Sequence, residues 1–75
     1  MMFLSDLKMG EKAKVVMLEN PKKTKRRLIN LGLTCGTAIT LIRKAPFGDP
    51  IEIRVRDFYL ALRCSDADKI RVDLL

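Results

Sequence analysis

Apolar and polar residues alternate along several short segments of this chain, a period-two pattern that predicts half-buried β-strands. The most regular is residues 51–56, in which β-branched apolar residues are separated by charged ones. Residues 11–18, 38–44, 58–63 and 70–74 are also rich in apolar positions, with less regular alternation. Turns rich in Gly, Pro and Asp separate the segments, notably at residues 45–50. We therefore expect a mainly β chain of about five strands.

The first of these strands has an apolar side that we expect to face the core. Ala13, Val15 and Met17 share that side, while Val16 and Leu18 make the far end apolar on both faces. A small open sheet exposes its edge strands, and closure removes those edges. The predicted architecture is therefore a small SH3-like or OB-like barrel.

One helix is expected between the first and second strands, from Asn20-Pro21 to about Leu31. Asn is a good helix cap and Pro suits the first turn. Gly32 would end the helix in the left-handed conformation, so that Leu33 folds back onto Leu28. The predicted core-facing stripe is Thr24, Leu28 and Leu31, flanked by Ile29. Shorter helical turns are expected after Ser5 and Ser65, each acting as a cap.

The net charge of +6 arises mainly from the start of this helix. Five basic residues lie within six positions: Lys22, Lys23, Lys25, Arg26 and Arg27. Without them, acidic and basic residues nearly balance. The macrodipole disfavours cations in the first half of a helix, so these residues do not serve helix stability. They form a candidate docking site for an acidic surface, the alternative being a solvated helix face.

A second candidate contact is Phe47, in the turn at residues 45–50. An aromatic side chain at a loop tip can anchor a partner or fold over the end of the barrel. Gly and Pro in this segment serve the turn geometry. Asp49 is expected to hydrogen-bond to nearby backbone N–H groups.

Several chemistries are excluded by composition. The chain has no His, no phosphate-binding glycine loop and no apolar run long enough to span a bilayer. Cys35 and Cys64 are far apart in the sequence, and two thiols alone do not complete a tetrahedral metal site. The spacing of Asp49 and Asp66 does not indicate that either carboxylate assists, and a site formed between two subunits is left open. We expect no catalytic residues, no metal ligands, reduced thiols and a cytoplasmic location.

The order of motifs resembles the FeoA family of ferrous iron transport proteins. The similar segments are residues 4–15, the Arg-Leu-Ile-Asn-Leu-Gly-Leu run at 27–33, the Ala-Pro-Phe-Gly-Asp-Pro-Ile run at 45–51, and residues 60–63 with 67 and 70–72. Together they span nearly the whole chain. Two turn positions depart from the family pattern, because Met9 and Cys35 stand where prolines are common.

This resemblance implies a single SH3-like barrel domain over residues 1–75, similar also to the C-terminal domain of metal-dependent repressors. It implies a cytosolic, non-catalytic accessory that binds the transporter FeoB through its GTPase (G) domain and meets the membrane only through that transporter. No cofactor is expected to be tightly bound, although the family is associated with ferrous and other transition metal ions. A homo-oligomer is left open, as is a modulating or an assembling role.

Two alternatives belong to other functional classes. A nucleic-acid-binding barrel needs exposed stacking aromatics together with positive charge, and only Tyr59 is expected to face outward on a strand. A metal-responsive regulatory barrel needs a tight sensor site, which the absence of His disfavours. Nucleic acid is therefore not an expected partner.

Overall fold

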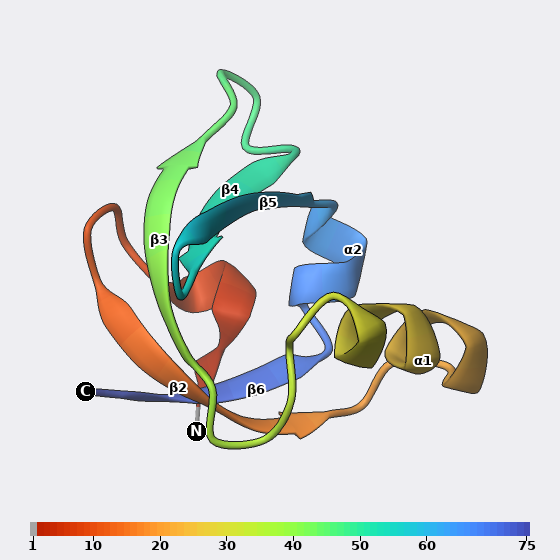
Figure 1. Cartoon of the computed structure of the whole chain (residues 1–75). Coiled ribbons are helices and arrows are strands. Elements are labelled where there is room, and N and C mark those ends of the chain that lie inside the picture. The colour runs from red at the N-terminus through yellow and green to blue at the C-terminus, as the bar shows by residue number, and fades with distance from the viewer. Residues whose placement is uncertain (1) are drawn as a thin grey trace.

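The computed structural model describes residues 2–75, which form one antiparallel sheet of six strands (Figure 1). In chain order the elements are β1 (Met2–Phe3), the 3-10 turn η1 (Leu4–Asp6), β2 (Lys12–Leu18), α1 (Lys22–Asn30), β3 (Ala38–Lys44), β4 (Ile51–Val55), β5 (Phe58–Leu62), α2 (Cys64–Ala67) and β6 (Ile70–Leu74). Across the sheet the order is β1-β6-β2-β3-β4-β5. The expected mainly β architecture with one inserted helix is confirmed. The expected strand number was one too low, because β1 has only two residues and shows no periodicity.

The sheet curls around an apolar core, and α1 lies outside the curl (Figure 1). Alternate residues of β3 and β4 point inward, which confirms the period-two prediction for both strands. The inward residues, each at most 1% exposed, are Ile39, Leu41, Ile51, Ile53 and Val55. Leu4 of η1 and Leu7, which follows that turn, are fully buried in the same core.

The expected orientation of Met17 was wrong. Ala13 and Val15 face the core, but the pairing of β2 with β6 shifts register between Val15 and Met17. This β-bulge inserts one extra residue and reverses the alternation beyond it. Val16 and Met17 are consequently 42% and 50% exposed, and Leu18 returns to the core.

The helix ends as predicted. Gly32 has a φ of +102°, its N–H donates to the Ile29 carbonyl, and the Leu33 N–H donates to the Leu28 carbonyl, both at 3.0 Å. These two bonds define a Schellman ending, and they bring buried Leu33 against the helix. The predicted apolar stripe was too wide, because Leu28 is the one buried residue of α1 and Leu31 is 37% exposed.

The predicted caps were wrong at all three helix starts. The Asn20 side chain makes no cap hydrogen bond to α1 and reaches α2 instead. At η1 the Asp6 carboxylate, rather than Ser5, accepts the Phe3 N–H at 2.9 Å. Ser65 lies inside α2, one residue after its start. At η1 and α2 a carboxylate, from Asp6 and Asp49 respectively, accepts an N–H at the helix start, whereas no side chain caps α1.

Candidate functional site

The basic residues of α1 project from the outside of the barrel. All five predicted residues are exposed, and they follow one another around a helix of nine residues. Arg27 forms an ion pair with Asp66 at 3.2 Å. Within residues 2–75, the other four basic residues have no ion-pair partner. One cation therefore attaches α1 to the barrel, and four remain available to a partner.

The first turn of α1 contains no acidic residue, so nothing on the helix offsets its early cations. Cations near a helix N-terminus oppose the macrodipole, typically by about 0.3–1 kcal/mol each at low salt. Stability comes instead from burial of Leu28, from the Schellman ending and from the contact to α2. The structure thus keeps an uncompensated positive surface at some cost to the helix.

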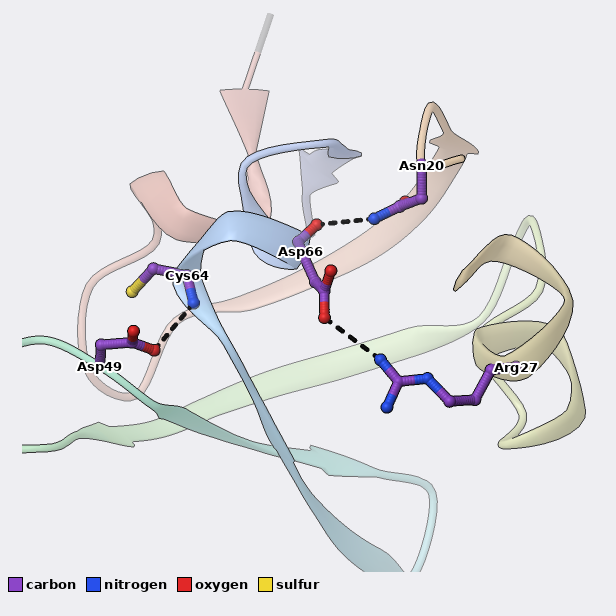
Figure 2. Close-up of polar contacts among 5 residues, drawn as sticks. All are labelled: Asn20, Arg27, Asp49, Cys64 and Asp66. Atoms are coloured by element: carbon purple, nitrogen blue, oxygen red, sulfur yellow. Dashed lines mark hydrogen bonds and ion pairs between the residues drawn. The ribbon is translucent and has the colours of Figure 1, made fainter. Parts of the chain in front are cut away.

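The start of α2 joins three segments that are distant in the sequence (Figure 2). The Asp66 carboxylate contacts Arg27 of α1, while its backbone carbonyl accepts a hydrogen bond from the Asn20 side chain at 3.0 Å. At the first residue of α2, the Cys64 N–H donates to the Asp49 carboxylate at 3.0 Å. These contacts fix where α1 and the β3–β4 loop lie relative to the barrel.

An apolar groove of about 220 Å³ lies between α1 and β2. Val16 and Met17, turned outward by the bulge, form part of it together with Ile29 of α1, which is 42% exposed. Lys25 and Cys35 also line the groove. The local sequence pattern does not reveal this groove, because simple alternation places Met17 inside the barrel and nothing nearby in the sequence indicates the bulge.

Phe47 lies at the tip of the β3–β4 loop and is 98% exposed. It does not fold over the barrel end, so one of its two predicted orientations is excluded. Figure 1 shows this loop at one extremity of the molecule, away from α1. The structure therefore does not bring Phe47 together with the basic residues of the helix.

The two cysteines occupy different environments. Cys35 is exposed in the turn before β3, whereas Cys64 is half-buried and its thiol donates to the Gly48 carbonyl. Desolvation raises the pKa of the Cys64 thiol, and the Asp49 and Asp68 carboxylates raise it further against an opposing effect of Lys44. A protonated thiol is a poor metal ligand.

The donor set does not fit a resident metal ion. No cluster of three or more Cys, Asp or Glu side chains occurs among residues 2–75, and the chain has no His. The carboxylates that could have assisted Cys64 already have partners, since Asp49 accepts the Cys64 N–H and Asp66 pairs with Arg27.

None of the helices described over residues 2–75 is long and apolar enough to cross a membrane.

Comparison with known proteins assigns a family. The FeoA domain profile matches residues 2–74. The solution structure of FeoA from Chlorobium tepidum is 39% identical and superimposes with a TM-score of 0.95, over 99% of this chain and 70% of that one. The crystal structure of Stenotrophomonas maltophilia FeoA with zinc is 31% identical, with a TM-score of 0.82 over 97% of this chain and 91% of that one. That protein is described as an SH3 domain protein, which agrees with the expected barrel class.

A curated relative from Porphyromonas gingivalis (strain ATCC BAA-308 / W83) is a fusion protein of Fe(2+) transport protein A and the Fe(2+) transporter FeoB. It is 36% identical over 74 residues, which are 99% of this chain and 9% of the relative. The chain therefore spans about a tenth of the length of this relative.

A manganese-dependent transcriptional repressor superimposes with a TM-score of 0.90 at 16% identity, over 99% of this chain and 36% of that one. At this identity the likeness shows the fold alone, and it confirms the expected structural resemblance to a repressor domain. Family membership also agrees with the expected absence of catalysis, since FeoA proteins are accessory proteins rather than enzymes. With the profile match over residues 2–74 and relatives above 30% identity, the chain belongs to the FeoA domain family.

Proposed function

We propose that this chain is a cytosolic accessory of ferrous iron uptake that binds an FeoB-type transporter through the cytosolic G domain of that transporter. The fusion in Porphyromonas gingivalis carries this proposal, because there an FeoA-like segment and FeoB are parts of one polypeptide. Linking two partners raises their effective concentration, so a fusion is favoured where the separate proteins act together. Ferrous ion is the cargo of the transporter here.

The proposed contact is made by α1 and the adjacent groove. Four exposed cations without ion-pair partners among residues 2–75 provide a positive surface for an acidic one. Val16, Met17 and Ile29 add exposed apolar area beside these charges. Interfaces commonly combine an apolar centre with a charged rim, and this surface has both parts.

Phe47 is proposed as a second contact point. An almost fully exposed aromatic ring is costly to leave in water, and such rings are common anchors at interfaces. Because the loop is separate from α1, the two contacts are expected to contribute independently. Phe47→Ala should weaken binding by a similar factor in the wild-type chain and in an α1 variant.

The test measures the affinity of this chain for the full-length FeoB-type transporter from the same source, immobilised in nanodiscs, by biolayer interferometry. A variant with Lys22, Lys23 and Lys25 all replaced by Glu reverses the charge of α1 without touching its one buried residue. We expect at least about tenfold weaker binding for it at low salt. Wild-type binding should also weaken between about 0.05 M and about 0.5 M salt, as ions screen the attraction.

A matched variant replaces Lys8, Lys14 and Lys69 by Glu, which changes the total charge equally at exposed positions outside α1. Its affinity should stay closer to that of the wild type than the affinity of the α1 variant. Equal losses for both variants would show that only net charge matters. Absence of binding by the wild-type chain would contradict the partner itself.

A further inference from the structure

A second group of cations lies on the outer face of the sheet. Lys12 of β2 is the register partner of Thr40 in β3, and Thr40 is the register partner of Arg54 in β4. Neighbouring strands are about 4.8 Å apart, so these three side chains stand in one row. Their sequence neighbours Ala13, Ile39 and Val55 point into the core, so the row faces outward.

This row borders a shallow concavity of about 250 Å³. Lys12, Arg54 and Arg56 supply three cations, and Ala38 adds little bulk between them. No carboxylate is among the residues that line the concavity, as far as residues 2–75 are concerned. Within the same range, none of the three cations forms an ion pair. The concavity therefore concentrates positive charge that the fold does not neutralise.

Arg54 is held in place by the fold. Its Nε–H donates to the backbone carbonyl of Arg56 at 3.0 Å. This bond restricts the guanidinium plane and leaves the N–H groups of both terminal nitrogens free to donate. A planar pair of such donors matches two oxygens of a phosphate or carboxylate, and restricting the side chain beforehand lowers the entropy lost on binding.

We propose that Lys12, Thr40, Arg54 and Arg56 form an oxyanion site that binds a phosphate group. Three cations and a hydroxyl around one concavity provide more donors than a single carboxylate can use. A phosphate group offers several acceptor oxygens and up to two negative charges. The site uses no residue of α1 or of its groove, so it is independent of the transporter contact. A soluble phosphate compound and a lipid headgroup share this chemistry.

The first arm of the test titrates the ¹⁵N-labelled full chain with pyrophosphate and follows the backbone amide resonances. Shifts should be largest at Lys12, Thr40, Arg54 and Arg56 and small along α1. The second arm measures sedimentation of the chain with phosphatidylglycerol vesicles and with phosphatidylcholine vesicles. Binding to pyrophosphate assigns a soluble phosphate ligand, and binding to phosphatidylglycerol vesicles alone assigns a headgroup.

Variants separate a built site from general attraction. Arg54→Ala removes the restrained guanidinium group and should weaken binding about tenfold. Arg54→Lys keeps the positive charge but loses the planar pair of N–H donors, so its affinity should lie between those of the wild-type chain and the Ala variant. Lys8→Ala removes one exposed cation outside the site and should change affinity by less than about twofold. The amide spectrum of each variant shows whether the barrel is intact.

Three results would overturn the proposal. One is the absence of a response to both pyrophosphate and phosphatidylglycerol vesicles. Another is a set of shifts spread evenly over α1 and the other exposed cations. The last is a folded Arg54→Ala variant that binds as tightly as the wild-type chain.

Discussion

The carboxylate of Asp49 accepts a hydrogen bond from the backbone N–H of Cys64 at 3.0 Å, across fifteen positions of sequence (Figure 2). Cys64 is the first residue of α2, so a loop residue satisfies an N–H group that the short helix leaves without an intrahelical partner. The same helix contacts α1 through Asp66. Asp49 therefore links the β3–β4 loop to α2, and Asp66 links α2 to α1.

Replacement of Asp49 by Ala should destabilise the chain by about 1 kcal/mol, the usual cost of losing a helix-capping side chain. Asp49→Asn retains an acceptor oxygen and should cost less. Urea denaturation followed by far-UV circular dichroism measures both. Equal stability of the Ala variant and the wild type would show that this contact is not a working cap.

Two adjacent residues of α1 should respond differently to truncation. Leu28 is fully buried and Ile29 is 42% exposed. Leu28→Ala should cost about 2–5 kcal/mol by leaving a cavity, a large part of the stability typical of a small domain. Ile29→Ala, on the same helix, should cost less than about 1 kcal/mol. Similar losses at the two positions would contradict the assigned burial.

The Schellman ending predicts a specific effect at Gly32. An added Cβ would meet the Phe58 ring at 3.6 Å, an ordinary contact, so space does not limit substitution. The backbone does, because φ is +102° and L-residues in left-handed conformations cost about 1–2 kcal/mol. Gly32→Ala should destabilise by about that amount in thermal unfolding. Gly32→Asn should cost less, because Asn tolerates this conformation better than Ala.

The cysteines should differ in reactivity with iodoacetamide. The raised pKa of Cys64 keeps its thiol protonated to higher pH, and the side chain is half-buried. At about pH 8 it should be alkylated more slowly than exposed Cys35, as read by peptide mass spectrometry. In denaturant the two rates should converge. Faster alkylation of Cys64 in the folded chain would contradict its assigned environment.

The raised pKa of Cys64 also determines the direction in which folding stability changes with pH. The folded state holds the Cys64 proton more tightly than the unfolded state does, because its pKa is raised. This contribution to stability is fully present below the ordinary thiol pKa of the unfolded state. It is lost as the pH rises through the higher pKa that Cys64 has in the folded state. Cys64→Ser should reduce this alkaline loss.

Local patterns predicted much of the fold. The alternation of Ile51, Ile53 and Val55 identified β4, and Gly32 with Leu33 identified the end of α1. Both signals depend only on neighbouring residues, because strand faces and helix endings are set by local geometry.

The predictions that were wrong concern features that depend on residues brought together by folding. The bulge that exposes Met17 arises from the pairing of β2 with β6. The carboxylate at the start of α2 comes from the β3–β4 loop, and Asn20 contacts α2 across forty-six positions. Likewise, the row containing Lys12 and Arg54 depends on strand register. Composition located the basic helix but could not show the groove beside it.

The most direct test of the central claim is residue-resolved mapping of the transporter contact. The ¹⁵N-labelled full chain would be mixed with unlabelled full-length FeoB-type transporter in nanodiscs, in each nucleotide state, and amide signal loss recorded along the sequence. We expect salt-sensitive signal loss centred on α1, at Lys22–Asn30, and on the groove residues Val16 and Met17, with a separate effect at Phe47. Uniform signal retention, or loss centred elsewhere on the barrel, would contradict it.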